Sequence, residues 1–144
     1  MKRILVGLDG SPREAEVLDA ARALADKIGA ELILFRAISL PTELPPRALA
    51  VPPASLGELL VDDARQHLTA LAARLPESVH PRVRVDLGAP WAAIRDAARI
   101  ENADLIAIGS HGYGGIDRLL GTTAAKVVNH ADRSVLVIRS TKPV

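Results

Sequence analysis

Apolar residues along the chain fall into short continuous runs that alternate with longer stretches of helical spacing. Four runs, at 4–8, 32–35, 104–109 and 134–138, read ILVGL, LILF, DLIAIG and SVLVI. Continuous apolar runs of this length are typical of strands that are covered on both faces. The segment 82–87, RVRVDL, alternates apolar and charged residues instead, which predicts a half-exposed strand at a sheet edge.

Helical spacing predicts four helices between these strands, at 12–28, 55–76, 90–102 and 122–131. Capping boxes at 11–14 and 55–58 mark the starts of the first two, and Gly29 is placed to end the first. Strands that alternate with helices predict an α/β fold of Rossmann-like type. We therefore expect 1–144 to form a single domain, an open five-stranded parallel sheet with helices on both faces.

Composition narrows the classes of function. The 144 residues carry a net charge of +1 and three aromatic side chains, too few to steer nucleic acid or to stack its bases. No apolar run approaches the roughly 18 residues that a membrane-spanning helix needs. The chain has no cysteine, which excludes disulfides and agrees with a cytoplasmic location, and its four histidines show no metal-ligand spacing. We expect no nucleic-acid partner, no membrane partner and no protein-bound metal.

One loop concentrates glycine. Five of the ten glycines lie between 109 and 121, directly after a predicted strand. Glycine is favoured where φ must be positive or where a ligand approaches the backbone closely. The loop enters a helix at Gly121-Thr122-Thr123, where free N–H groups, the helix dipole and two hydroxyls suit a phosphate group. Parallel sheets bind ligands beyond the carboxyl ends of their strands, and both this loop and Asp9 fall there.

The loop is not one of the common phosphate-binding motifs. GxxxxGK[ST] is absent because Gly121 is followed by threonine, and a GxGxxG pattern from Gly112 fails at Asp117. Without the P-loop lysine and with no evident base, we expect no efficient phosphoryl transfer. Two simpler interpretations stay open. Thr122 only N-caps its helix, or Asp9 only caps or braces the first turn of the helix that follows it.

Three segments together resemble the universal stress protein family. They read ILVGLDGSPREAEVLDAA from residue 4, NADLIAIGSHGYGG from 102 and RLLGTTAAKVVNHADRSVLVIR from 118. The resemblance covers essentially the whole chain and implies the family's fold and a homodimer. The ATP-binding branch of that family has G-x2-G-x9-G-[ST], in which the glycines and the hydroxyl wrap the phosphates and the ribose.

On this resemblance, eight residues match nucleotide-binding positions: Asp9, Ala37, Ile108, Gly109, Gly112, Gly121, Thr122 and Thr123. Asp9 matches the acidic residue near the ribose and phosphates. Ala37 and Ile108 match positions that contact adenine, largely through backbone and apolar surface. Mg²⁺ is expected with ATP, since phosphates and one or two carboxylates usually hold it. The chain departs from the pattern because eight residues, not nine, separate Gly112 from Gly121.

Two further features point to partners. The strand 135–138 is apolar on both faces, and pairing with the same strand of a second copy would cover it at an edge. A helix packed over that strand is the alternative. The loop 38–54 holds five of the ten prolines and is longer than ordinary connections. We interpret it as a flap over the ligand or as part of the dimer surface.

The leading hypothesis is an ATP-binding universal stress protein that acts as a nucleotide-dependent stress-response or signalling homodimer, with at most slow ATP hydrolysis. The alternative is a nucleotide-independent dimeric interaction or chaperone-like module. The shortened spacing between Gly112 and Gly121 favours that alternative.

Overall fold

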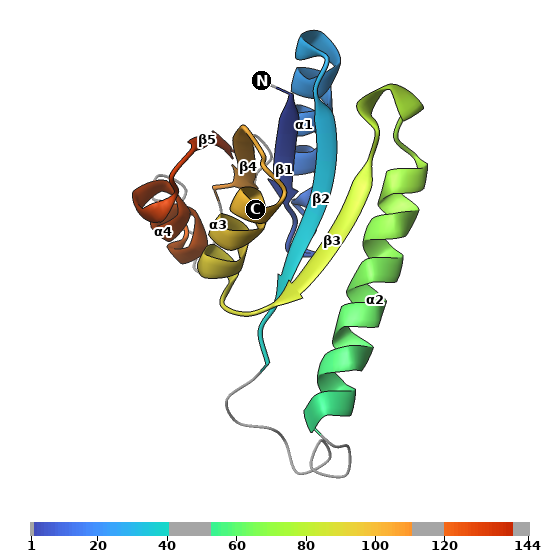
Figure 1. The fold of residues 1–144 in the computed structure, drawn as a ribbon, viewed down its shortest axis with the longest axis vertical. Coiled ribbons are helices and arrows are strands. Elements are labelled where there is room, and N and C mark those ends of the chain that lie inside the picture. The colour runs from blue at the N-terminus through green and yellow to red at the C-terminus, as the bar shows by residue number, and fades with distance from the viewer. Residues whose placement is uncertain (1, 41–52, 111–119, 140–144) are drawn as a thin grey trace.

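A parallel sheet forms the middle layer of the molecule. The computed structural model describes residues 2–40, 53–110 and 120–139. In chain order the strands are β1 Arg3–Gly7, β2 Glu31–Ile38, β3 Arg82–Leu87, β4 Leu105–Gly109 and β5 Ser134–Ile138. All the pairings are parallel, and the order in space is β3-β2-β1-β4-β5 (Figure 1). Strands β2 and β3 therefore extend the sheet on one side of β1, and β4 and β5 extend it on the other.

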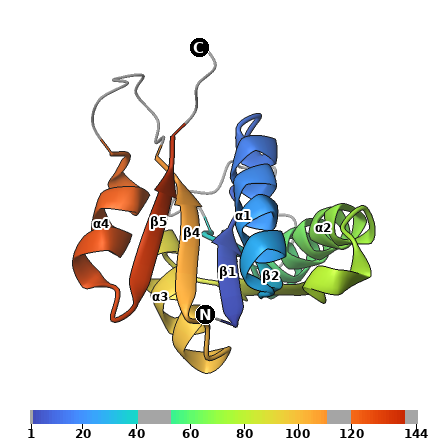
Figure 2. The same cartoon turned by 90° about the horizontal axis from the view of Figure 1, so that it is seen from above.

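The described α-helices cover both faces of this sheet. They are α1 Glu14–Ile28, α2 Pro53–Ala73, α3 Pro90–Ile100 and α4 Thr122–His130, with a short 3₁₀-helix, Glu77–Val79, before β3. Helices α1 and α2 lie on one face, and α3 and α4 lie on the other (Figure 2). The predicted fold class is confirmed. Among the described residues, none of these helices combines the length and the apolar character that crossing a lipid bilayer requires.

Alternation along the strands divides the core into two clusters. Leu32 and Leu34 of β2 pack toward α1 and α2, whereas Ile33 and Phe35 pack toward α3 and α4. All four side chains are fully buried. Burial of a side chain of this size contributes roughly 1.5–3 kcal/mol. Both faces of β2 are therefore apolar, which explains the continuous apolar run in the sequence.

Both predicted capping boxes are wrong. Helix α1 begins at Glu14, and the Ser11 N–H donates to Asp9 Oδ1 at 2.9 Å, so Glu14 has no capping role at that amide. Helix α2 begins at Pro53, which places Ser55 inside the first turn instead of before it. At 11–14, the Asp9 side chain already accepts the Ser11 N–H, which is the group that the Glu14 side chain would accept in a capping box.

The two edge strands are β3 and β5. The prediction that 82–87 forms a half-exposed edge strand is confirmed. In β5, the side chains from Val135 to Ile138 are all only partly buried, and they pack against both core clusters. Side chains on both faces of β5 thus pack against the core but stay partly exposed. The backbone edge of β5 that faces away from β4 pairs with no described strand.

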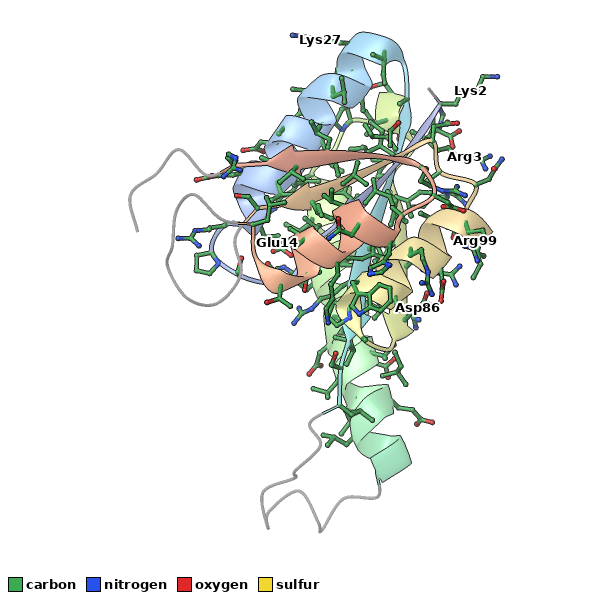
Figure 3. All side chains as sticks on the ribbon, turned by 90° about the vertical axis from the view of Figure 1, so that its left-hand side faces the viewer. Lys2, Arg3, Glu14, Lys27, Asp86 and Arg99 are labelled. Atoms are coloured by element: carbon green, nitrogen blue, oxygen red, sulfur yellow. The ribbon has the colours of Figure 1, made fainter. Side chains whose placement is uncertain are left out.

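Hydrogen bonds and ion pairs join the amino ends of the strands. Asp104 Oδ2 accepts the N–H groups of Lys2 and Arg3 at 2.7 and 3.0 Å, and these bonds lower the pKa of Asp104. Arg3 also pairs with Glu31 at 3.3 Å. Figure 3 shows Lys2 and Arg3 on one side of the molecule and Glu14 on the other. This network therefore lies away from the carboxyl ends of β1 and β4.

Candidate functional site

Strands β1 and β4 run side by side where the strand order reverses. Val6 pairs with Ala107, so the two strands end within two residues of each other. The next helices diverge, because α1 covers one face and α4 the other. Parallel sheets bind their ligands at such points, beyond the carboxyl ends of the strands. We call the residues that border this point, Asp9–Ser11, Ser110 and Gly121–Thr123, the carboxyl edge.

The turn after β1 is held by its own hydrogen bonds. Asp9 Oδ1 accepts the Ser11 N–H at 2.9 Å, and Ser11 Oγ accepts the Arg13 N–H at 3.3 Å. Gly10 has a φ of +74°, a conformation that residues with a side chain rarely adopt. Asp9 thus braces the turn that precedes α1, not the first turn of the helix, which begins at Glu14. The other oxygen of the exposed Asp9 carboxylate bonds to no residue that the structure describes.

The start of α4 presents free backbone donors. Gly121 is the N-cap residue, and no side chain caps the helix, so the interpretation that Thr122 is the N-cap is wrong. The Gly121 N–H donates to Ser110 O at 2.8 Å. The N–H groups of Thr122, Thr123 and Ala124 find no acceptor within the described part of the chain. The Gly121 N–H is therefore not a free donor, and the free donors come from the three residues after it.

Ser110 is a residue of this edge that the sequence analysis missed. It is 2% exposed, its N–H donates to Ile138 O at 2.9 Å, and its carbonyl accepts the Gly121 N–H. These bonds join the ends of β4, β5 and the segment that leads into α4. Its place between two glycines of the quoted motif gave no sign of this role. The predicted site residue Gly112 belongs to 111–119, outside the described residues.

The residues predicted to contact adenine lie on the α3 and α4 face. Ile108 is buried, and its Cγ2 lies 3.0 Å from the position that a Cβ would take at Gly7. Ala37 is partly buried against the same cluster. Gly109 points to the other face, where a Cβ would lie 3.1 Å from Val17 Cγ2. Packing thus accounts for Ile108 and Gly109, and Ile108 can reach a ligand only through its backbone.

A buried carboxylate near this edge also escaped the sequence analysis. Glu14 is 8% exposed, and its Oε2 lies 2.7 Å from Nε2 of His67 on α2. The second oxygen, Oε1, is buried and has no hydrogen-bond partner among the described residues. The pair joins the start of α1 to α2 across 53 positions of sequence. No local pattern marks such a contact, and the sequence pattern at 11–14 assigns Glu14 to a capping box instead.

Metal-binding geometry is not found in the described segments, where no group of three or more His, Asp or Glu side chains is placed to hold an ion. The unused oxygen of Asp9 suits a Mg²⁺ ion that phosphates also hold, because such ions need only one or two carboxylates from the protein. The predicted Mg²⁺ therefore fits this edge only as a companion of a phosphorylated ligand.

A shallow hollow of about 610 Å³ lies at the opposite end of the sheet. It is lined by Arg3, Glu31, Glu77, His80, Pro81 and Arg82. Arg3 pairs with Glu31 at 3.3 Å and Arg82 with Glu101 at 3.4 Å, so both arginines are already compensated. We assign no site to this hollow.

The structure brings five predicted residues to the ends of β1 and β4 or the start of α4: Asp9, Gly109, Gly121, Thr122 and Thr123. Ala37 and Ile108 lie one position before the ends of β2 and β4. Contact of any of them with a nucleotide stays a prediction. Most of the loop 38–54, at 41–52, falls outside the described residues, so its predicted role as flap or dimer surface also stays a prediction.

Comparisons with known proteins agree with this architecture. The model of the universal stress protein family matches residues 1–139. The chain is 30% identical over 140 residues to universal stress protein A homolog 1 of Coxiella burnetii, covering 95% of each protein. It matches the structure of universal stress protein UspA from Lactobacillus plantarum with a TM-score of 0.73 and 26% identity, over 96% of this chain and 97% of that one.

A universal stress protein solved in complex with cAMP is also similar. Its TM-score is 0.68 at 24% identity, over 97% of this chain and 98% of that one, and this likeness shows the shared fold. The match to the family model over nearly the whole length, together with the topology, settles the classification. This chain belongs to the universal stress protein family.

Proposed function

We propose that this chain binds ATP at its carboxyl edge and acts as a nucleotide-dependent stress-response or signalling homodimer in the cytoplasm. The observation that carries the proposal is the start of α4. There a glycine N-cap is followed by three N–H groups that have no acceptor among the described residues. Such a helix start attracts phosphate through both its donors and its dipole.

The neighbouring residues supply the rest of a nucleotide site. The hydroxyls of Thr122 and Thr123 add donors at the same helix start. The unused oxygen of Asp9 can accept a ribose hydroxyl or help hold the Mg²⁺ that accompanies ATP. When bound, that ion supplies charge neutralisation of the phosphates. The complex of a structural relative with cAMP supports a nucleotide as the class of ligand.

The site residues support binding and not fast catalysis. The residue after Gly121 is Thr122, so the lysine that P-loop enzymes place on the phosphates is absent from this position. Asp9 is braced by Ser11, which leaves its carboxylate a poor candidate for a mobile base. We expect any ATP hydrolysis by this chain to be slow.

The direct test is to denature freshly purified protein, analyse the released nucleotide, and then titrate nucleotide-free protein with ATP and Mg²⁺ by calorimetry. Near-stoichiometric nucleotide, or micromolar binding, supports the proposal. No released nucleotide and no binding up to millimolar ATP would contradict it. That second outcome would favour the nucleotide-independent interaction module, consistent with the eight-residue spacing between Gly112 and Gly121.

The homodimer is proposed to form through β5, and its backbone suggests a specific variant. Ile138 O accepts the Ser110 N–H, so by alternation the N–H and C=O of Val137 point away from β4 to the open edge. Of the backbone groups of β5, Val137→Pro removes only that outer donor and no hydrogen bond to β4. We expect it to convert a dimer to a monomer in light scattering, with far-UV circular dichroism retained. Val137→Ala keeps the N–H and should stay dimeric. A dimer that survives Val137→Pro would place the interface elsewhere.

A further inference from the structure

Arg36 places a guanidinium beside the turn that carries Asp9. It lies two residues before the end of β2 and is half-buried, on the α1 and α2 side of the sheet with Leu34 and Ile38. A Cβ at Gly10 would lie 2.7 Å from Nη1, 3.0 Å from Cζ and 3.1 Å from Nη2 of Arg36. These distances place the guanidinium directly against the turn at Gly10.

This guanidinium has no counter-ion within the described residues. Asp9 is the acidic residue next to Gly10, and its Oδ1 accepts the Ser11 N–H. Glu14, one turn further on, bonds to His67. Neither carboxylate forms a salt bridge with Arg36, since each salt bridge of the described residues joins other groups.

The other arginines on described strands behave differently. Arg3, Arg82 and Arg84 pair with carboxylates at 3.3, 3.4 and 2.8 Å. A partly desolvated charge without a partner is unfavourable, and an anionic ligand would relieve that cost. Arg36 therefore differs from them in having no carboxylate partner among the described residues, which leaves its charge available to an anionic ligand.

The position of Arg36 suits a phosphorylated ligand of the carboxyl edge. Strand β2 flanks β1 on one side and β4 flanks it on the other, so Arg36 and the start of α4 approach the end of β1 from opposite sides. The start of α4 offers neutral N–H donors and a partial charge, whereas a guanidinium offers a full charge and paired donors for phosphate oxygens.

We propose that Arg36 pairs with the phosphates of the nucleotide bound at the carboxyl edge, and that this edge therefore selects nucleoside di- and triphosphates over nucleosides. The inference rests on the proposed nucleotide-binding function and identifies Arg36 as a positive charge that pairs with the negative phosphates. A purely structural Arg36 would only position the Asp9 turn, and its loss would then weaken adenosine and ATP equally.

The test compares Arg36→Gln, Arg36→Lys and the control Arg74→Gln, which makes the same charge change at an exposed residue beyond α2. Each protein is titrated by calorimetry with adenosine, ATP and inorganic tripolyphosphate at one fixed ionic strength. For Arg36→Gln we expect ATP and tripolyphosphate to bind at least about tenfold more weakly, because one charge-assisted contact is lost, and adenosine to be unchanged. Arg36→Lys should recover part of the loss, and Arg74→Gln should match the wild type.

Each outcome decides between the two proposals. Equal weakening of adenosine and ATP, or no change in any ligand, overturns the role of Arg36 while nucleotide binding stands. Tripolyphosphate binding that depends on Arg36 in a wild type that ignores adenosine and ATP overturns the nucleotide proposal and keeps a phosphate role. A wild type that binds none of the three overturns both. Thermal unfolding of each variant shows whether the fold is retained.

Discussion

His67→Ala is expected to lower the free energy of unfolding by about 1–3 kcal/mol at pH 7, because it removes the partner of a buried carboxylate. Glu14 Oε2 would lose its 2.7 Å bond to His67, and Oε1 already has no partner among the described residues. The carboxylate would then be buried with neither oxygen bonded. Its side chain is 9% exposed, whereas that of His67 is 45% exposed, so the cost falls on the glutamate. Urea denaturation gives the change directly.

A second substitution identifies the cause. In the His67→Ala background, Glu14→Met replaces the buried charge with an apolar group of similar length, and we expect it to recover most of the lost stability. Gln66→Ala changes the adjacent, exposed position of α2 to the same residue and should alter stability by less than about 0.5 kcal/mol. If His67→Ala lowered the free energy of unfolding no more than Gln66→Ala does, the Glu14–His67 pair would not contribute to stability.

The strands were predictable from sequence because each depends on its own short pattern. The apolar runs that form β1 and β4 are buried on both faces, and the alternation of 82–87 reflects an edge. Gly29 ends α1 at a φ of +70°, which its residue type alone suggests. Signals of this kind need no knowledge of distant residues.

The helix starts were less predictable because neighbouring segments compete for the same groups. Ser11 fits a capping-box pattern with Glu14, but Asp9 takes the Ser11 amide and His67 takes the Glu14 carboxylate. The first competitor is two residues away, and the second is 53 positions away. A local motif cannot register the second competitor, since only the packing of α2 beside α1 brings it near.

The candidate site shows the same division. The glycine cluster directed attention to the start of α4, where ligand binding stays a prediction, whereas the structure explains Gly109 by the close approach of Val17. Ser110 and Arg36 matter through a backbone bond to β5 and a contact with Gly10, neither of which has a sequence signature. Residue type indicated where a ligand could bind, whereas the groups that shape the edge depend on tertiary contacts.

Gly121→Val is expected to weaken ATP binding at least about a hundredfold with little effect on the fold. Gly121 has φ −60° and ψ 164°, a conformation open to valine, and its N–H can still donate to Ser110 O. The branched side chain would instead occupy the approach to the N–H groups of Thr122 and Thr123. Losing two charge-assisted bonds of about 1.5–3 kcal/mol each corresponds to a hundredfold or more in affinity. Calorimetric titration with ATP and Mg²⁺ measures the effect.

The size of the substituent separates obstruction from unfolding. Gly121→Ala adds one methyl group at the same position and should weaken ATP less than valine does, since more of the approach stays open. Both variants should unfold within a few degrees of the wild type, because the Ser110–Gly121 bond that closes this edge is kept. If Gly121→Val bound ATP as tightly as the wild type, the phosphates would not lie at the start of α4. If it failed through a large loss of thermal stability, Gly121 would be needed for packing, and the phosphate role would then depend on the alanine variant, which is small enough to leave the fold intact.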